Sequence, residues 1–399
     1  MYDINPRRLK LAAIVTVFRR HSNAQHILDR LLDGYGWNGQ YHRPHMDLVA
    51  LYVDQIGADD LSRERESRHP LLNSYPTIAE ALTLGGSTLA VDGVVLVGQD
   101  GRYPTSKNGQ TEYPGYQFFK QIVDVFQSSN RTAPVFNQKH LSSAWVDAKH
   151  MYEVSRSMGF PFMAGSSIPV TRRIPSIEMP TGSKVREALC ICYGEVDNFH
   201  GLEAIQCMVE RRSGGEVGVR WLQVYRGNRF WTALDQRVWS HELMQAALCR
   251  SHTLTPAREG FNDILPSYDD MRRLVEDPIA YTYQHEDGLQ CTVLLMNGLV
   301  GDFNFAAQLV EPLQIISTQM YRPMPDSTTT LANCFSPLVF NMERMFISGR
   351  APYPVERTLL TTGLSASGIE SLYRNQLRID TPHLAIRYVS QPGSTFERA

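Results

Sequence analysis

The fold is decided by residues 9–34, LKLAAIVTVFRRHSNAQHILDRLLDG. The first part, LKLAAIVTVF, is almost continuously apolar, which is typical of a strand that is buried on both faces. From Asn23 onward, apolar residues recur every three or four positions as far as Gly34, as in an amphipathic helix that ends at a glycine. A buried strand followed by such a helix predicts the start of a parallel α/β sheet.

The same alternation continues through the first 160 residues. Short apolar runs predict further strands at 47–55, 91–101 and 133–138. Helical spacing predicts further helices at 77–86, 113–130 and 143–159. We therefore expect residues 1–160 to form a Rossmann-like domain, in which helices cover both faces of a parallel sheet.

The pattern changes after residue 160. Longer apolar runs joined by hairpin-like turns predict strands at 185–194, 219–227 and within 289–309. Helical spacing appears at 199–215 and 241–252, and again in the tail at 354–376. We expect residues 161–399 to form a second α/β domain with a mostly antiparallel open sheet and a helical tail.

The composition is that of a soluble globular protein, with 43% hydrophobic and 20% charged residues. The net charge of −2 gives no basic surplus for binding nucleic acid or an anionic membrane. Apolar runs stay shorter than the ~18–20 residues of a membrane span, and we interpret the apolar start as a strand, not a signal peptide. Six scattered cysteines without a C-x-x-C pair indicate buried thiols in a reducing cytoplasm.

Polar residues gather where the predicted parallel strands end, which is where ligands of such sheets bind. Asp54 ends one strand, and PVFNQKHLS, residues 134–142, places Asn137, Lys139 and His140 at the end of another. Lys139 is a candidate acid or base if its surroundings lower its pKa, and otherwise a solvated lysine that caps a loop. Asn137 and His140 are candidate ligand contacts, although His140 is equally placed to begin the following turn.

Two loops offer groups that suit a sugar. The long loop 98–116 carries Tyr103, whose flat ring and polar tip suit stacking and hydrogen bonding to hydroxyls. The segment AGSSIPVTRRIP, residues 164–175, carries Ser166 and Arg172, which can bind hydroxyl or carboxylate groups. The alternative for the second segment is an ordinary linker between the two domains.

The run DNFHGLE, residues 197–203, holds a histidine and two acids. His200 and Glu203 are three apart and share a helix face, so Glu203 or Asp197 could orient His200 for proton transfer. The alternative is an ion pair between His200 and Glu203 on the helix surface. The same three side chains could also ligate a divalent metal.

The order of these parts resembles the Gfo/Idh/MocA family of glucose–fructose oxidoreductases and inositol dehydrogenases, over roughly the whole chain. Where that family carries Glu-Lys-Pro, this chain has Gln138-Lys139-His140, and DNFHGLE supplies a histidine with an acid three positions later. The resemblance implies a Rossmann domain, an open-sheet substrate domain, a sugar or polyol substrate and an NAD or NADP cofactor. It also implies a homo-oligomer formed through the bare sheet face.

The chain departs from the family after its first strand. The family runs into G-x-G-x-x-G, which lets the backbone approach a pyrophosphate, whereas VTVFRRHS has no glycine. The side chains of Thr16, Phe18 and Arg19 should obstruct that path, although Arg19 could hold phosphate by charge. Thr16, Arg19 and Asp54 are therefore the candidate cofactor contacts, with Asp54 placed for a ribose hydroxyl.

Three functions remain open at this stage. The first is a sugar or polyol oxidoreductase in which Lys139 and His200 handle a hydroxyl proton. The second keeps the fold without nicotinamide and acts as a carbohydrate lyase, hydratase or glycoside hydrolase, with or without a divalent metal. The third is a sugar-binding sensor without catalysis.

Overall fold

The computed structural model describes residues 7–254, 263–322 and 332–398, which fall into two compact units. The N-terminal unit contains residues 7–105, 111–165 and 332–355, and the C-terminal unit contains 106–110, 166–322 and 356–398. The predicted boundary at 160/161 therefore falls shortly before the end of the first unit. Residues 332–355, predicted in the second domain, group with the first instead.

The N-terminal unit is built on a six-stranded sheet in which every strand pairing is parallel. Its strands, in spatial order, are β5 (Asn73–Ser74), β4 (Met46–Val53), β1 (Leu9–Val15), β6 (Gly93–Val97), β7 (Val135–Gln138) and β8 (Phe162–Gly165). Residues 11–15 of β1 have no exposed surface, because neighbours on both sides and on both faces enclose them. The predicted parallel sheet is confirmed.

Helices separate these strands: α1 (Asn23–Asp33), α2 (Ser62–Arg68), α3 (Ile78–Thr83), α4 (Gly115–Ser128) and α5 (Trp145–Met158). The Ser22 hydroxyl caps α1 by accepting from the Gln25 backbone N–H. Gly34 ends α1 at φ 79°, and a β-carbon there would lie 2.6 Å from the His42 carbonyl oxygen, so only glycine fits. The short hairpin of β2 (Tyr35–Trp37) and β3 (Gln40–His42), like α2, was not predicted from the sequence.

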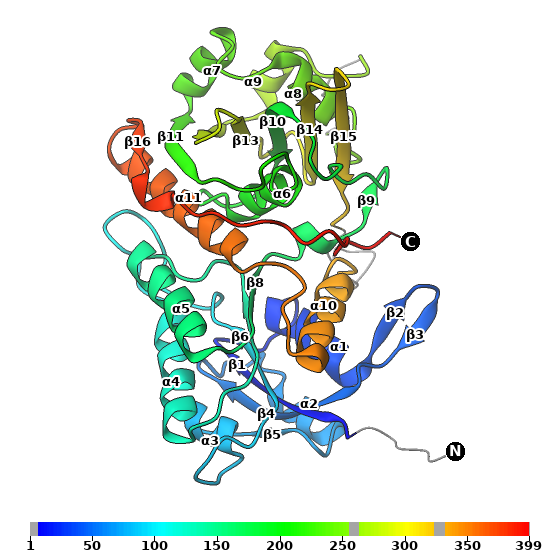
Figure 1. Ribbon diagram of the computed structural model, residues 1–399, viewed down its shortest axis with the longest axis vertical. Coiled ribbons are helices and arrows are strands. Elements are labelled where there is room, and N and C mark those ends of the chain that lie inside the picture. The colour runs from blue at the N-terminus through cyan, green and yellow to red at the C-terminus, as the bar shows by residue number, and fades with distance from the viewer. Residues whose placement is uncertain (1–6, 255–262, 323–331, 399) are drawn as a thin grey trace. The chain divides into compact units, whose positions relative to one another are not determined.

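A late segment completes the N-terminal unit. Helix α10 (Phe335–Ser348) lies beside α1, far from it in the chain (Figure 1). The buried Arg30 of α1 donates to Ser336 Oγ at 3.0 Å and to the Ala332 carbonyl at 2.8 Å. Trp37 stacks on Phe340 with ring centres 4.5 Å apart. These contacts explain why the segment groups with residues that precede it by about three hundred positions.

The C-terminal unit holds an eight-stranded mixed sheet. Its strands, in spatial order, are β16 (Ile379–Asp380), β11 (Val219–Arg226), β12 (Ile279–His285), β13 (Gln290–Leu295), β10 (Val185–Cys192), β14 (Phe303–Leu309), β15 (Gln314–Met320) and β9 (Arg173–Ile174). Only β10 and β13 pair in parallel, so the predicted mostly antiparallel sheet is confirmed. The predicted hairpin within 289–309 is wrong, because β10 lies between β13 and β14.

Helices cover both faces of this sheet. They are α6 (Phe199–Val209), α7 (Asn228–Asp235), α8 (His241–Leu248), α9 (Tyr268–Leu274) and α11 (Glu356–Tyr373), with short 3-10 turns at η1 (Ile168–Val170) and η2 (Pro382–Leu384). Helices α7 to α9 pack on the face that carries Leu189 and Ile191, while α6 packs on the face of Cys192. The sheet face that we expected to be bare is thus covered by the chain itself, which removes the physical reason given for a homo-oligomer.

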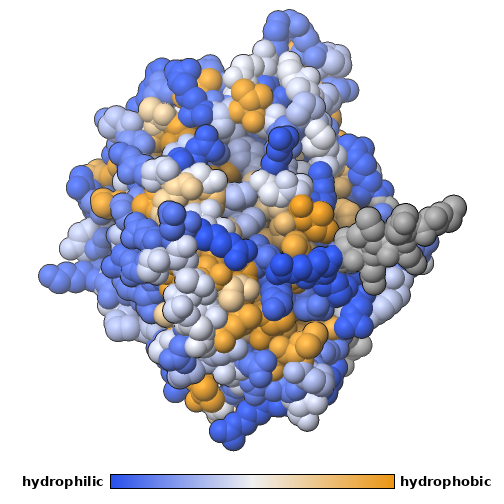
Figure 2. All heavy atoms as spheres, turned by 60° about the horizontal axis from the view of Figure 1, so that its bottom comes forward, coloured by the Kyte–Doolittle hydropathy of each residue, from blue (hydrophilic) through white to orange (hydrophobic). Residues whose placement is uncertain are grey.

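The cysteines are mostly buried, and the exposed apolar side chains are dispersed. All six cysteines are free thiols, and all but Cys249 are buried. Large apolar side chains that stay exposed lie on different elements of both units, and Figure 2 shows hydrophobic residues among hydrophilic ones on one face. In the part of the chain that the structure describes, no helix is long and apolar enough to span a membrane.

Candidate active site

A cavity of about 350 Å³ lies at the carboxyl edge of the N-terminal sheet. It is lined by the loops that follow three neighbouring strands: Val17–Arg19 after β1, Gln55–Asp60 after β4, and Gly101–Arg102 after β6. This edge is where parallel α/β sheets bind ligands, and the volume is within the range of small-molecule sites. The polar groups of these loops decide what the cavity can hold.

The loop after β1 uses its backbone donors internally. The Thr16 N–H donates to the Val97 carbonyl at 3.1 Å, Arg19 N–H to Ser22 Oγ at 3.3 Å, and His21 N–H to Gln25 Oε1 at 2.5 Å. The side chains of Thr16 and Phe18 have no exposed surface. We had expected from the sequence that the Phe18 ring would obstruct the ligand path. The ring is instead buried in the core. Thr16 holds the loop in place, since its hydroxyl accepts from the Asp100 N–H at 3.3 Å.

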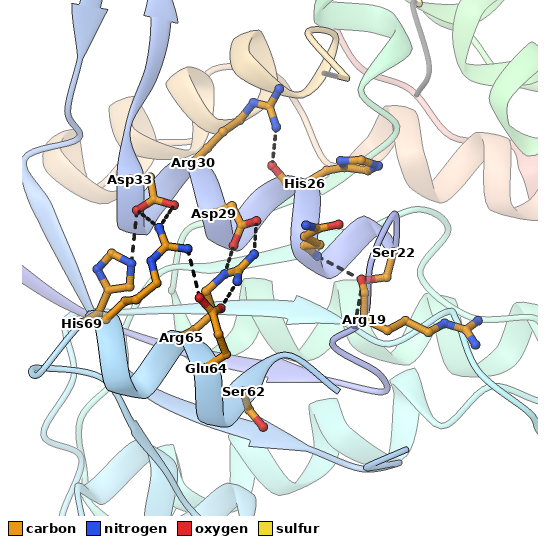
Figure 3. A network of polar contacts seen from close by, with 12 residues as sticks. Arg19, Ser22, His26, Asp29, Arg30, Asp33, Ser62, Glu64, Arg65 and His69 are labelled. Atoms are coloured by element: carbon orange, nitrogen blue, oxygen red, sulfur yellow. Dashed lines mark hydrogen bonds and ion pairs between the residues drawn. The ribbon is translucent and has the colours of Figure 1, made fainter. Parts of the chain in front are cut away.

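The loops after β4 and β6 are tied to the loop after β1. The backbone N–H groups of Gln55 and Leu61 donate to the carbonyls of Thr16 and Phe18, both at 2.8 Å. The loop after β4 is also joined to the loop after β6. Gln55 Oε1 accepts from the Arg102 N–H at 3.0 Å, and Gln55 Nε2 donates to the Arg102 carbonyl at 2.9 Å. Arg19 forms an ion pair with Asp100 at 3.1 Å, and Figure 3 shows its side chain directed away from α1.

Helices α1 and α2, which flank the first two loops, are also joined by charge. Arg65 bonds both oxygens of Asp29, at 2.7 and 2.8 Å, and Arg68 bonds Asp33 at 3.0 Å (Figure 3). The two-oxygen pairing of Arg65 fixes the orientation of its guanidinium and is the stronger geometry. The second half of α1 is therefore joined to α2 by two ion pairs.

Asp54 and Tyr103, predicted to contact different ligands, contact each other. The Tyr103 hydroxyl donates to Asp54 Oδ2 at 2.7 Å, and the Tyr52 hydroxyl donates to Oδ1 at 3.0 Å. Burial and the neighbouring Asp54 carboxylate raise the pKa of Tyr103, so this phenol stays a donor. Asp54 itself remains exposed and can accept a further hydrogen bond from a hydroxyl.

These contacts test whether a dinucleotide fits at this edge. A pyrophosphate on the loop after β1 needs backbone N–H groups that point outward and no side chains in between. Here the N–H groups of Thr16, Arg19 and His21 already donate to β6, to Ser22 and to α1. The loop after β4 also donates two backbone hydrogen bonds to this loop. The residues present do not fit a pyrophosphate cradle of the G-x-G-x-x-G kind.

Lys139 follows β7 in a conformation that lysine rarely adopts. Its φ is 64°, and its backbone N–H donates to the Gly165 carbonyl at 3.0 Å. No side-chain partner of its ammonium group lies among the residues described, and the side chain is half-buried. A left-handed conformation costs free energy for most residues other than glycine, and strained residues of this kind are enriched at functional sites.

Asn137 and His140, predicted to contact substrate, instead hold the Lys139 turn. Both are buried. Asn137 Nδ2 donates to the His140 carbonyl at 3.0 Å, and Gln99 Nε2 lies 2.8 Å from His140 Nδ1. These two residues therefore act through the backbone that carries Lys139.

In the C-terminal unit, Ser166 orients His200. Ser166 Oγ lies 2.7 Å from His200 Nδ1 and accepts from the Ile168 N–H at 3.1 Å. Ser166 is buried and His200 is half-buried at the start of α6. Because Ser166 Oγ accepts from the Ile168 N–H, we assign its own proton to the hydrogen bond with His200 Nδ1, and this assignment places the proton of the neutral imidazole on Nε2. Ser166, predicted to contact substrate, is therefore a partner of His200.

Glu203 does not pair with His200, in contrast to both predictions for it. Its carboxylate is buried and accepts from Thr361 Oγ1 at 2.7 Å, Thr358 Oγ1 at 3.3 Å and the Ser166 N–H at 3.3 Å. Burial raises the pKa of Glu203, although the Arg357 charge and these hydrogen bonds oppose the rise. Glu203 thus reaches His200 only through Ser166.

Asp197 was predicted to orient His200 or to ligate a metal together with His200 and Glu203. Asp197 precedes Asn198, the N-cap residue of α6, and its Oδ1 accepts from the N–H of Phe199, the first residue of the helix, at 3.4 Å. Within the described ranges, no group of three or more His, Cys, Asp or Glu side chains could hold a metal ion. The predicted ligand set of His200, Glu203 and Asp197 therefore does not form.

Comparison with known proteins gives matches only among solved structures, since no family model and no curated protein matches the chain. One is a myo-inositol dehydrogenase from Lactobacillus casei in complex with NAD(H) and myo-inositol, at 11% identity and TM-score 0.54 over 98% of this chain and 100% of that one. Another is a myo-inositol dehydrogenase from Corynebacterium glutamicum, at 12% identity and TM-score 0.52 over 94% and 98% of the two chains. A third is GenD2 from gentamicin A biosynthesis in complex with NAD, at 12% identity and TM-score 0.53 over 94% and 97%.

The chain has the inositol dehydrogenase fold. At these identities the likeness establishes the fold alone, and it confirms at that level the Gfo/Idh/MocA resemblance found in the sequence.

The sequence reasoning missed three residues beside His200. Tyr193, Phe303 and Arg322 follow or begin strands at the same end of the sheet, and the Phe303 ring meets the His200 ring edge-on at 6.4 Å. Arg322 was missed because β15 was not predicted, so nothing placed this residue near β10. Tyr193 and Phe303 lie within predicted strands, but the sequence did not show that these strands pair, as β10 and β14 do. Arg172, which was predicted, is exposed, and its carbonyl accepts from the Tyr321 N–H at 2.8 Å.

Proposed function

We propose that this protein is an enzyme that acts on a sugar or polyol, and that His200 exchanges a proton with a substrate oxygen. The observation that carries the proposal is the hydrogen bond of 2.7 Å between Ser166 and His200, backed by the buried Glu203. A half-buried histidine held in one tautomer by a buried network is the arrangement that acid–base catalysis needs.

Ser166 lets His200 act in both directions. In the neutral imidazole the serine hydroxyl donates to Nδ1, and the Nε2 proton is the one that the ring would give to a substrate oxygen. When the ring is protonated, the hydroxyl can rotate and accept from Nδ1–H. A carboxylate can only accept from Nδ1–H, whereas a hydroxyl can donate to Nδ1 of the neutral ring and accept from Nδ1–H of the protonated ring, which suits a reversible proton transfer.

Lys139 is proposed as a second group for the same reaction. This role is supported by the left-handed backbone at φ 64° and by an ammonium group that has no side-chain partner within residues 7–254, 263–322 and 332–398. An ammonium near a substrate oxygen stabilises negative charge that develops there. Exchange of Lys139 for methionine should then reduce turnover without loss of folding.

The first version of the chemistry is a sugar or polyol oxidoreductase, in which a bound nicotinamide would exchange hydride with the substrate. It is supported by the fold shared with dehydrogenases described with NAD or NAD(H). The second version is elimination, hydration or hydrolysis without nicotinamide. It is supported by the loop after β1, whose residues do not cradle a pyrophosphate.

The first experiment is an inventory of the protein as purified. Nucleotide released on denaturation is identified by mass, metals are quantified on the same sample, and NADH and NADPH are titrated by fluorescence. Bound or titratable nicotinamide supports the oxidoreductase. No nicotinamide binding at millimolar concentration removes that version and leaves proton-transfer chemistry alone.

The second experiment tests the enzyme itself on a panel of sugars, cyclitols and their acids. His200→Asn should lower turnover by about 10²–10⁴-fold. His252→Asn, a change of an exposed histidine in the same unit, is the matched control and should have no effect. Equal turnover in all three proteins would contradict the role of His200. Ligand binding without any turnover would identify the protein as a sugar-binding sensor.

A further inference from the structure

We infer that Arg322 binds an anionic group of the substrate, a carboxylate or a phosphate ester, beside His200. The inference rests on the proposed function and adds to it the class of substrate, a sugar acid or sugar phosphate in place of a neutral polyol. Its evidence lies entirely within the C-terminal unit.

The sheet brings the residues concerned to one end. Strand β10 ends at Cys192, and Tyr193 follows it. Phe303 begins the antiparallel neighbour β14 and pairs with Met320, the last residue of β15. Arg322 comes two residues after Met320, and His200 begins the helix that follows β10. Tyr193, Phe303, Arg322 and His200 therefore gather where three adjacent strands start or end.

The Arg322 guanidinium is held on two aromatic rings. Its central carbon lies 5.6 Å from the Tyr193 ring centre and 5.7 Å from that of Phe303, and Nη1 donates to the Tyr193 hydroxyl. The Phe303 ring, which is buried, also meets the His200 ring at 6.4 Å. One aromatic ring thus touches both the cation and the imidazole.

This cation has no acidic partner among the described residues. A guanidinium has five N–H donors. Among the described residues, the Arg322 guanidinium makes one hydrogen bond, from Nη1 to the Tyr193 hydroxyl. The nearby acid Asp302 is buried and already accepts from Ser251, His252, Asn304 and Gln319. By contrast, Arg378, which also lies over a ring in this unit, has Asp380 at 3.7 Å.

The chemistry of the missing partner follows from these facts. A half-buried, immobilised guanidinium with spare donors matches the planar oxygens of a carboxylate or phosphate, which it can bind through two parallel hydrogen bonds. A neutral polyol would leave that charge unpaired. Beside a proton-donating histidine, the cation would also stabilise negative charge that forms on the substrate.

The test measures binding to the full-length protein. D-glucose and D-galactose are compared with their uronates and their 6-phosphates by saturation-transfer NMR and calorimetry, at low and high salt. We expect at least one acid to bind tenfold or more tightly than its parent sugar, with the difference reduced by salt. A preference for uronates identifies a carboxylate, and a preference for 6-phosphates identifies a phosphate.

Variants then assign the preference to Arg322. Arg322→Gln should abolish it, Arg322→Lys should retain part of it, and Arg378→Gln should leave it unchanged. Thermal unfolding checks that each variant is folded. A preference that survives Arg322→Gln overturns the inference, as does equal binding of sugars and acids or a failure of every acid to bind.

The same series separates this inference from the proposed function. Turnover of neutral substrates that is unaffected by Arg322→Gln but lost in His200→Asn would keep the function and reject the anion subsite. Acid binding lost in Arg322→Gln, together with full turnover in His200→Asn, would keep the subsite and reject the function.

Discussion

His285 Nδ1 lies 2.9 Å from Glu216 Oε1, and both side chains are completely buried. Glu216 also accepts from Arg212 Nη1 at 3.1 Å and from Gln206 Nε2 at 2.6 Å, so its carboxylate joins the end of α6 to β12. Burial by itself would raise the pKa of Glu216, but the His285 and Arg212 charges outweigh it and hold the pKa well below its ordinary range. The carboxylate is thus a structural anion of the C-terminal unit.

Glu216→Gln should destabilise the protein by about 3 kcal/mol near neutral pH, because it removes the buried carboxylate that pairs with Arg212 and His285. Arg212 then keeps the partly exposed Asp287, which lies 2.7 Å from its Nε atom. A lowered folded-state pKa means that the stabilisation is present above the ordinary carboxyl value and is lost as pH falls through the folded value. The gap between wild type and variant should therefore shrink as the pH drops below about 4. Urea unfolding at several pH values measures it.

The matched control is Glu311→Gln, which breaks the exposed pair with Lys184. Its cost should be less than about 1 kcal/mol at every pH, since solvent screens that pair. A Glu216→Gln protein that is as stable as this control would contradict the structural role of the buried anion.

Ser166→Ala should change the tautomer of His200. The neutral ring loses its donor to Nδ1, so the proportion with the proton on Nδ1 should rise, as read from ¹⁵N shifts of the labelled histidine. Turnover should fall roughly fivefold to tenfold, which is the value of one hydrogen bond. Ser371→Ala removes another buried serine of this unit and serves as control, because it should cost stability without moving the His200 signals. An unchanged His200 spectrum in Ser166→Ala would refute the assigned contact.

Lys139→Gly should separate backbone strain from function. Glycine adopts φ 64° freely, so the variant should be as stable as wild type or up to about 1 kcal/mol more stable. Activity should nevertheless fall, because the ammonium group is gone. Arg237→Gly, at an exposed residue with φ 56°, should give a similar stability change with full activity. If Lys139→Gly destabilises the protein strongly, the lysine side chain is structural.

Arg30→Met should loosen α10. Arg30 also donates to the His26 carbonyl at 2.7 Å, and burial lowers its pKa. Loss of the guanidinium leaves the Ala332 carbonyl and Ser336 without their donor, at a cost of about 2 kcal/mol. Hydrogen exchange should rise in 335–348 and stay constant in β10. Arg20→Met, at an exposed arginine of the same unit, should change neither region.

The sequence predicted what depends on local periodicity. Strand β1 and helix α1 could be predicted from the sequence, because each kind of burial leaves its own pattern. A strand buried on both faces is continuously apolar, whereas a helix buried along one stripe has apolar residues every three or four positions. The location of Asp54 and Lys139 at the carboxyl edge of the sheet followed from the predicted order of strands and helices. The placement of α10 did not follow, because its docking depends on Arg30 and Trp37, which are remote in the chain.

The partner of His200 could not be predicted for a similar reason. The spacing of His200 and Glu203 on one helix favoured a direct pair. Glu203 instead turns toward Thr358 and Thr361 of α11, a helix whose position the sequence does not reveal. Ser166 then takes the place beside the imidazole that an acid was expected to fill.

The return of the chain to its first unit constrains how the protein is made. Arg30 leaves the ribosome 306 residues before Ser336, its partner on α10. During that interval the newly made Rossmann-like unit lacks the helix that covers α1 and Trp37, while almost the whole second sheet is synthesised. The nascent chain therefore exposes an apolar surface for most of translation, and truncation after residue 165 would make that exposure permanent.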